Sequence, residues 1–197
     1  ARNVAKLLSI PTFNTEFAEG SSCVYASAQE PPMPQQPTPA RRLRDLLARG
    51  KLIVAPGVYD GYSARLVEAA GFETAATTGA GIANSLLGVD DTGVMGLTDN
   101  VDHCRRLARV LSIPLTADAD TGYGNPLNVH YTVKLFEEAG VAGVNIEDQV
   151  NPKRCGHMPG KEVIAIEEMQ KKIEAACLAR RDDHFMIIVR TDALAME

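Results

Sequence analysis

From residue 41 onward, apolar segments of strand length alternate with amphipathic segments of helix length. Short apolar runs predict buried strands at 52–58, 74–78, 114–118, 143–147 and 185–190. Helical spacing of apolar residues predicts helices at 41–49, 63–70, 98–111, 126–138 and 166–179. Strands and helices that alternate at this spacing are joined by right-handed crossovers and form a parallel sheet. The predicted fold class is therefore α/β.

Two α/β architectures fit this order of elements, an open doubly wound sheet and a (β/α)8 barrel of the TIM type. In both, ligands bind beyond the carboxyl ends of the strands. A (β/α)8 barrel typically takes about 250 residues. In a barrel, residues 41–197 would therefore form the N-terminal part of the catalytic domain, with about five of the eight strands.

Residues 1–40 differ in composition from the rest of the chain. They hold six of the eleven prolines, and the run from Pro31 to Pro39 cannot supply a regular set of backbone donors. Arg2 and Lys6 precede the first acidic residue, Glu16. We expect either a Pro-rich arm or a targeting segment, so that the protein is cytoplasmic or, if this segment directs import, mitochondrial.

The charge balance argues against two classes of partner. The chain has 20 Lys and Arg against 25 Asp and Glu, a net charge of −5, and no basic run long enough to follow a nucleic-acid backbone. No apolar run reaches the roughly 18 residues that cross a bilayer. We therefore expect no nucleic-acid partner and no membrane span. The four cysteines are widely spaced, and we expect reduced thiols.

Acidic residues stand at the carboxyl ends of two neighbouring predicted strands. Asp118 and Asp120 follow one strand, and Glu147 ends the next. Asp118 and Asp120 are two residues apart, so they point the same way as long as the strand continues. Converging carboxylates repel one another unless a cation lies between them, and Mg²⁺ or Mn²⁺ prefers such oxygen ligands. The alternative is that these acids cap helices or pair with Arg190 and Lys153.

A loop rich in glycine and proline follows the fourth predicted strand and carries a second chemical feature. Cys155 lies there among Lys153, Arg154 and His157. Neighbouring cations stabilise a thiolate, so we expect Cys155 to exchange protons near neutral pH. The alternative is an inert loop cysteine. We expect the remaining cysteines to be inert: Cys23, Cys104 and Cys177.

Four motifs occur in order at these strand ends, and together they resemble the isocitrate lyase and phosphoenolpyruvate mutase superfamily over about residues 41–197. The motifs are Asp118-Ala119-Asp120-Thr121-Gly122-Tyr123-Gly124, Ile146-Glu147-Asp148-Gln149, Lys153-Arg154-Cys155-Gly156-His157 and Arg190-Thr191-Asp192. The resemblance implies a (β/α)8 barrel whose last helix is exchanged between subunits of a dimer-based homotetramer. It also implies a Mg²⁺ ion that holds the enolate of a 2-oxo acid.

The resemblance further implies roles for single positions. At the metal it implies Asp118 and Asp120, with Glu147 farther from the ion. The positions implied in binding a small carboxylate substrate are Thr78, Gly79, Ala80, Asp91, Cys155, Gly156 and Arg190. The positions implied in catalysis are Cys155, Lys153, His157 and Arg190.

The loop motif separates members of this superfamily. Carbon–carbon lyases and oxaloacetate hydrolases keep a cysteine where this chain has Cys155, whereas the phosphoenolpyruvate mutases lack it. Arg154 and the compact chain resemble the 2-methylisocitrate lyases, but Ala76 and Asn145 stand where those lyases have Tyr and His. The segment 78–81 is similar to oxaloacetate hydrolases and to carboxyvinyl-carboxyphosphonate phosphorylmutases.

Three hypotheses for the function follow. The first is Mg²⁺-dependent cleavage of a C–C bond in a small hydroxy di- or tricarboxylate, such as 2-methylisocitrate, with Cys155 protonating the resulting carbanion. The second is oxaloacetate hydrolysis or the rearrangement of a carboxyphosphonate by a phosphonomutase. The third is a chain that catalyses nothing, because five strands do not close a barrel and the strand at 185–190 keeps an unpaired edge.

Overall fold

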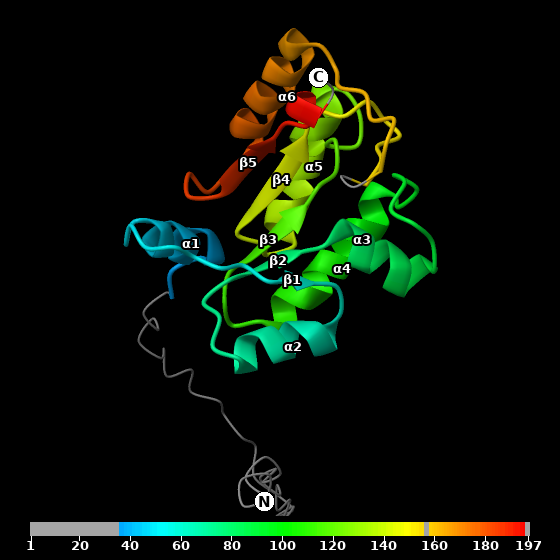
Figure 1. The fold of residues 1–197 in the computed structure, drawn as a ribbon. Coiled ribbons are helices and arrows are strands. Elements are labelled where there is room, and N and C mark those ends of the chain that lie inside the picture. The colour runs from blue at the N-terminus through cyan, green and yellow to red at the C-terminus, as the bar shows by residue number, and fades with distance from the viewer. Residues whose placement is uncertain (1–35, 156–157, 196–197) are drawn as a thin grey trace, which may run out of the picture. The chain divides into compact units, whose positions relative to one another are not determined.

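The computed structural model describes residues 36–155 and 158–195, so most of the predicted arm lies outside the described residues. Five strands lie side by side in chain order (Figure 1). The strands are β1 (Gly57–Val58), β2 (Ala75–Thr77), β3 (Leu115–Asp118), β4 (Gly143–Glu147) and β5 (Met186–Arg190). The helices are α1 (Pro39–Leu47), α2 (Gly61–Ala69), α3 (Gly79–Ile82), the π-helical η1 (Ala83–Leu87), α4 (Leu97–Val110), α5 (Pro126–Glu138), α6 (Ile166–Ala179) and the 3-10 helix η2 (Ala193–Ala195). Within these described ranges, no helix is long and apolar enough to cross a membrane.

The order of the strands decides between the two architectures. A doubly wound sheet reverses its strand order at a switch point and carries helices on both faces. Here all pairs are parallel and the order runs from β1 to β5 without reversal. Along β3, buried Leu115 and Ala117 alternate with partly exposed Thr116 and Asp118. One face is thus covered and the other partly open, as in the wall of a (β/α)8 barrel.

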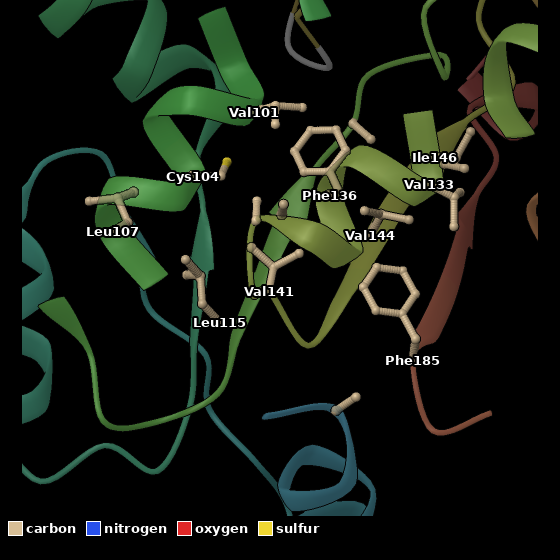
Figure 2. Packing of buried hydrophobic residues seen from close by; sticks show 14 of the residues in the cluster. Val101, Cys104, Leu107, Leu115, Val133, Phe136, Val141, Val144, Ile146 and Phe185 are labelled. Atoms are coloured by element: carbon tan, nitrogen blue, oxygen red, sulfur yellow. The ribbon is translucent and has the colours of Figure 1, made fainter. Parts of the chain in front are cut away.

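The core lies between the covered face of the sheet and the helices (Figure 2). Ten of its buried side chains are labelled there: Val101, Cys104, Leu107, Leu115, Val133, Phe136, Val141, Val144, Ile146 and Phe185. Because β3, β4, α4 and α5 all contribute to this one cluster, the positions of their carboxyl ends are coupled through packing.

Helix α5 shows why several elements have their predicted bounds. The side chain of Asn125 accepts hydrogen bonds from the backbone N–H groups of Leu127 and Asn128, and Pro126 takes the first position, where no N–H donor is needed. Gly140, with a φ of 89°, follows the end of the helix. The bounds of α5, α6 and β4 are those predicted from the sequence, because the signals that set them are local.

Helix α1 begins at Pro39, two residues before its predicted start, because Thr38 caps it through the backbone N–H of Arg41. The hydroxyl of Thr38 also donates to Asp182 at 2.7 Å, and the guanidinium of Arg44 donates to a backbone carbonyl at 3.1 Å in the same loop before β5. Helix α1 therefore packs near the amino end of β5, away from the strand ends that carry the acidic residues.

Two further expectations differ from the structure. The predicted strand at 52–58 is mostly wrong: only β1 pairs with β2, and Leu52 is 93% exposed. The ladder starts where the carbonyl of Pro56, a residue without an N–H donor, accepts from Ala76 at 3.1 Å. The helical segment 79–87 was not expected. It begins because the Thr78 hydroxyl accepts from the N–H of Gly81 at 3.2 Å.

Replacing Phe136 by alanine should lower the free energy of unfolding by about 3–5 kcal/mol, because the side chain is fully buried in this core. Urea denaturation followed by circular dichroism measures the loss. Tyr131→Ala on the same helix is the control, since that side chain is 59% exposed, and it should change stability by less than about 0.5 kcal/mol. Equal losses in both variants would contradict the packing described above.

Candidate active site

A cavity of about 380 Å³ opens at the carboxyl end of the sheet. The residues that line it are Thr77, Thr78, Gly79, Ala80, Asp91, Asp118, Glu147, Lys153, Cys155 and Arg190. Every one of these except Thr77 was predicted from the sequence. Among the other predicted positions, Asp120 lies beside the cavity against Lys153, and Gly156 and His157 lie outside the described residues.

Glu147 and Arg190 lie side by side because β4 and β5 pair in that register. Arg190 Nη1 lies 3.4 Å from Glu147 Oε2, and Nη2 donates to both carboxylate oxygens of Asp192 at 2.9 and 3.1 Å. Burial alone would lower the pKa of Arg190, but the hydrogen bond that it donates to Asp192 and the charge of Glu147 raise it above its ordinary value. The guanidinium is therefore a permanent cation in a fixed orientation.

The backbone after β2 approaches the carboxylates closely because residue 79 is glycine. A Cβ atom on Gly79 would lie 2.9 Å from Asp118 Oδ2 and 3.5 Å from Asp91 Oδ2. Any larger residue here would have to displace one of these side chains, so Gly79 keeps the carboxylates accessible from the cavity.

The chain leaves the strand conformation after Asp118. The strand alternation that would make Asp118 and Asp120 point the same way therefore does not extend to Asp120. β3 ends at Asp118, and Asp120 and Tyr123 adopt left-handed φ values of 48° and 61°. The buried amide of Asn100 donates to the carbonyl of Asp118 at 2.8 Å and to the hydroxyl of Tyr123 at 2.7 Å. That hydroxyl donates to Asp120 Oδ2 at 3.1 Å. Asn100 thereby stabilises an unusual backbone conformation.

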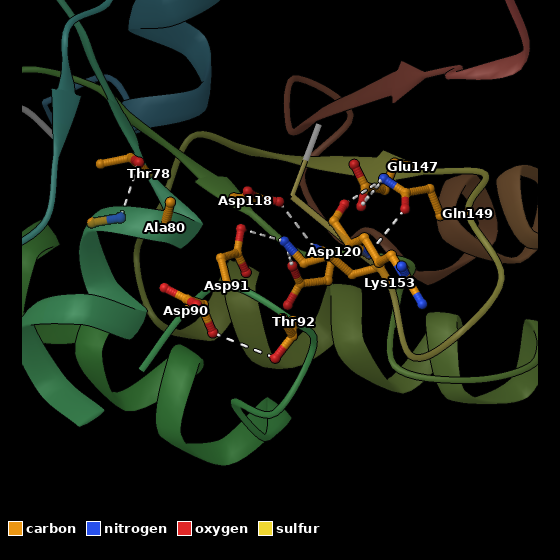
Figure 3. Close-up of polar contacts among 12 residues, drawn as sticks. Thr78, Ala80, Asp90, Asp91, Thr92, Asp118, Asp120, Glu147, Gln149 and Lys153 are labelled. Carbon is orange, nitrogen blue, oxygen red and sulfur yellow. Dashed lines mark hydrogen bonds and ion pairs between the residues drawn. The ribbon is translucent and has the colours of Figure 1, made fainter. Parts of the chain in front are cut away.

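Lys153 balances two of the carboxylates. Its Nζ lies 2.7 Å from Asp91 Oδ2 and 2.9 Å from Asp120 Oδ1 (Figure 3). Burial alone would lower the pKa of Lys153, but the two aspartates raise it well above the ordinary lysine value. Lys153 is therefore a fixed positive charge. The sequence left pairing with Lys153 or Arg190 as the alternative to metal binding. The structure shows such a pair between Asp120 and Lys153 and another between Glu147 and Arg190.

Asp118 differs from these acids, since no cation of the described residues lies within ion-pair distance of it. Burial and the charge of Asp120 raise the pKa of Asp118 to about 6. Burial likewise raises the pKa of Glu147 to about 7, against the opposing effect of Lys153. Both carboxylates line the cavity. The carboxylate of Asp118, which has no ion-pair partner among the described residues, suits a hard divalent cation.

The described residues contain no group of three His, Cys, Asp or Glu side chains that could hold a metal ion between them. Mg²⁺ characteristically takes one or two protein carboxylates and completes its octahedron with water and substrate oxygens. Asp118, which lines the cavity, is the residue that could hold such an ion, whereas Asp120 is engaged by Lys153.

Cys155 lies at the rim of the cavity, partly exposed and not in a disulfide. Its backbone N–H donates to the carbonyl of Asp91 at 3.1 Å, so two loops distant in the chain meet at this point. The guanidinium of the neighbouring Arg154 donates to the carbonyl of Pro159 at 3.2 Å.

The sequence did not single out two buried amides that shape this site, Asn100 and Gln149, which are each 1% exposed. A signal for Asn100 was present, because it stands one position from Val101 and four from Cys104 on the apolar stripe of α4. A buried polar residue on such a stripe needs partners. Gln149 stood in the sequence as the last residue of the motif Ile146-Glu147-Asp148-Gln149, but no role was predicted for it.

In the comparison with known proteins, the family match and the similar proteins agree with one another. Residues 43–197 match the family described as phosphoenolpyruvate phosphomutase. A probable 2-methylisocitrate lyase 2 of Corynebacterium glutamicum is 44% identical over 162 residues, which cover 82% of this chain and 52% of that protein. The crystal structure of a 2,3-dimethylmalate lyase has a TM-score of 0.77 and 42% identity, over 81% of this chain and 55% of the other.

A phosphonopyruvate hydrolase in complex with oxalate and Mg²⁺ is also similar, with a TM-score of 0.73 and 37% identity over 80% of this chain and 54% of the other. The chain spans about half the length of the curated relatives it matches. These matches agree with the five consecutive parallel strands and confirm the predicted (β/α)8 architecture. The chain therefore belongs to the phosphoenolpyruvate phosphomutase family, within the isocitrate lyase and phosphoenolpyruvate mutase superfamily.

Proposed function

We propose that the protein cleaves a carbon–carbon bond in a small hydroxy di- or tricarboxylate related to 2-methylisocitrate. One observation carries the proposal: the Cys155 thiol, the Asp118 carboxylate and the Arg190 guanidinium line the same cavity. Breaking a C–C bond heterolytically requires stabilisation of the charge that develops on oxygen and a proton for the carbanion. The similarity to a probable 2-methylisocitrate lyase and to a 2,3-dimethylmalate lyase supports the same chemistry.

Mg²⁺, or Mn²⁺ in its place, belongs to this proposal. Asp118 would hold the ion, with Asp120 and Glu147 close by. When bound, the ion supplies positive charge next to the substrate oxygens on which negative charge develops. The unbalanced charge of Asp118 supports the assignment, as does the complex of a related phosphonopyruvate hydrolase with oxalate and Mg²⁺.

Substrate carboxylates would bind at Arg190 and at the backbone that follows β2. Arg190 presents a guanidinium whose orientation is fixed by Asp192 and Glu147, and arginine pairs with carboxylates through two parallel hydrogen bonds. Thr78 and the small residues Gly79 and Ala80 leave the backbone of the opposite wall accessible. Two carboxylate-binding surfaces on one cavity suit a substrate with at least two carboxylates.

In the proposed step, a pocket carboxylate takes the proton of the substrate hydroxyl, and the hydroxyl carbon becomes a carbonyl as the C–C bond breaks. The electron pair of that bond passes to the other fragment, which leaves as an enolate. Cys155 donates its proton to the carbanion carbon and becomes a thiolate, which regains a proton from solvent. Lys153, already paired with Asp91 and Asp120, contributes positive charge and transfers no proton.

The test is to incubate the 197-residue chain with Mg²⁺ and 2-methylisocitrate, 2,3-dimethylmalate or oxaloacetate, and to follow products by proton NMR. Pyruvate together with succinate from 2-methylisocitrate, or with propionate from 2,3-dimethylmalate, would support the lyase. Acetate and oxalate from oxaloacetate would support the hydrolase instead. Binding of Mn²⁺ without any turnover would favour the third hypothesis, a chain that does not catalyse by itself.

A second candidate, cleavage or rearrangement of a phosphonate, is favoured by the similarity to the phosphonopyruvate hydrolase and by the family match. Incubation with phosphonopyruvate followed by phosphorus NMR distinguishes it. Loss of the P–C signal with release of phosphate, or its replacement by the P–O signal of an enol phosphate, would replace the lyase proposal. We also propose that the protein forms the homotetramer that the resemblance implies. Sedimentation velocity measures the oligomeric state.

Tyr123→Phe should weaken Mn²⁺ binding about tenfold, because partners that orient metal-site carboxylates typically contribute 10- to 100-fold in metal affinity. The variant removes only the hydroxyl that links Asn100 to Asp120. Titration of Mn²⁺ by electron paramagnetic resonance measures the affinity. Tyr131→Phe is the control, since its ring is largely exposed on α5. An unchanged affinity in Tyr123→Phe would remove Asp120 from the metal site.

A further inference from the structure

Gln149 lies two residues beyond the end of β4 and is 1% exposed, yet its side chain is a polar amide. Its Nε2 donates to the carbonyl of Arg154 at 3.0 Å, and its Oε1 accepts the N–H of the same residue at 3.0 Å. One side chain thus satisfies both backbone groups of Arg154. Such a pair of bonds replaces the strand or helix partner that a loop residue lacks.

These two bonds fix the residues on either side of Arg154. The N–H that Gln149 accepts belongs to the peptide between Lys153 and Arg154, and the carbonyl belongs to the peptide between Arg154 and Cys155. Lys153 is held further by Asp91 and Asp120. The place of the Cys155 backbone at the cavity therefore depends directly on Gln149.

The other contacts of the amide explain why glutamine suits this position. Nε2 also lies 3.2 Å from Glu147 Oε1 and 2.9 Å from Asp192 Oδ2, so its two hydrogens are shared among three acceptors (Figure 3 shows the contacts with Glu147 and the loop). A glutamate here would place a third carboxylate between two others, and an apolar side chain would leave both without this donor. Only a neutral side chain of this length that donates and accepts can join the loop to these acids.

We infer that Gln149 is a positioning residue, which sets the place of the Cys155 thiol at the cavity by holding the backbone of Arg154 against the ends of β4 and β5. This inference deepens the proposed function and rests on it for the role of Cys155. Whether Gln149 holds the backbone of Arg154 in place can be measured without substrate, metal or turnover.

The experiment compares Gln149→Leu and Gln149→Asn with the wild-type chain in limited trypsin digestion. Cleavage after Arg154 and alkylation of Cys155, both followed by peptide mass spectrometry, should accelerate roughly ten- to a hundredfold, because two hydrogen bonds that oppose local opening are lost. The asparagine variant keeps a neutral amide but is one methylene too short to reach all partners. It serves as the second variant if the leucine variant does not fold.

Glu137→Leu is the matched control. The carboxylate of Glu137 accepts from the backbone N–H of Arg181 at 2.9 Å and of Asp182 at 2.7 Å, so it holds another loop, before β5, in the same way. Its loss should accelerate cleavage after Arg181 and leave cleavage after Arg154 unchanged. The Gln149 variants should show the opposite pattern. Acceleration at both sites in every variant would indicate general destabilisation and overturn the inference.

In a form of the protein that turns over substrate, Gln149→Leu should lower kcat at least about tenfold with little change in KM, and should lower it no further in a Cys155→Ser background. Wild-type rates of cleavage and alkylation in both Gln149 variants would overturn the inference. Full turnover in Cys155→Ser would instead overturn the proposed role of the thiol, whatever the digestion shows. The two failures are therefore distinguishable.

Discussion

Replacing Cys155 by serine should lower turnover about 10²- to 10⁴-fold, the range that a positioned proton donor contributes. The serine hydroxyl has nearly the size of the thiol but is a far weaker acid, so the carbanion would lack its proton. The affinity for Mn²⁺ should stay within about twofold, because Cys155 contacts the loop of Asp91 through its backbone, which serine retains. Steady-state kinetics and a Mn²⁺ titration on the same preparation measure both quantities.

Cys177→Ser is the control for this result. Its thiol is exposed on α6 and lines no part of the cavity, and its turnover should equal that of the wild type. If Cys155→Ser turned over substrate at the wild-type rate, the proton would have to come from another group, and the lyase mechanism proposed above would be wrong.

Asp118→Asn should abolish the stabilisation that saturating Mg²⁺ or Mn²⁺ gives the wild-type chain, which amounts to about 2.7 kcal/mol when the free metal is 100 times its Kd. Without metal, the variant should be as stable as the wild type or more stable above pH 6. Burial and Asp120 raise the pKa of Asp118 from 3.8 to about 6, so the metal-free wild type loses stability as the pH rises between these two values, and the loss is complete above about pH 6. Asparagine removes that charge and can still accept the N–H of Asp120. Thermal melts with and without metal measure the effect.

Asp120→Asn should have the opposite effect on the metal-free protein. Lys153 is 4% exposed and would lose one of its two carboxylate partners while keeping Asp91, and a hydrogen bond to a charged group typically contributes about 1.5–3 kcal/mol. Asp90→Asn, an exposed acid outside the cavity lining, is the control and should melt and respond to metal like the wild type. A metal-dependent rise in melting temperature that survives in Asp118→Asn would show that the ion binds elsewhere.

Most secondary structure could be predicted because its signals are local. Asn125, Pro126 and Gly140 mark the two ends of α5 within the chain itself. The helix at 79–82 could not be predicted from periodicity, because three of its four residues are Gly or Ala and its start depends on the hydroxyl of Thr78. The apolar run at 52–58 was misleading, since strand pairing needs a partner in register as well as apolar residues.

The sequence by itself determined the α/β class, the superfamily and the residues that meet at the carboxyl ends of the strands. Parallel strands joined by right-handed crossovers must bring those ends to one edge, wherever the helices settle. Only the tertiary structure decided which acids form ion pairs, because Lys153 reaches Asp91 across 62 positions of the chain, whereas Asp118 has no ion-pair partner among the described residues. It also revealed the role of Gln149, since hydrogen bonds between a buried amide and a distant loop carry no periodic signal.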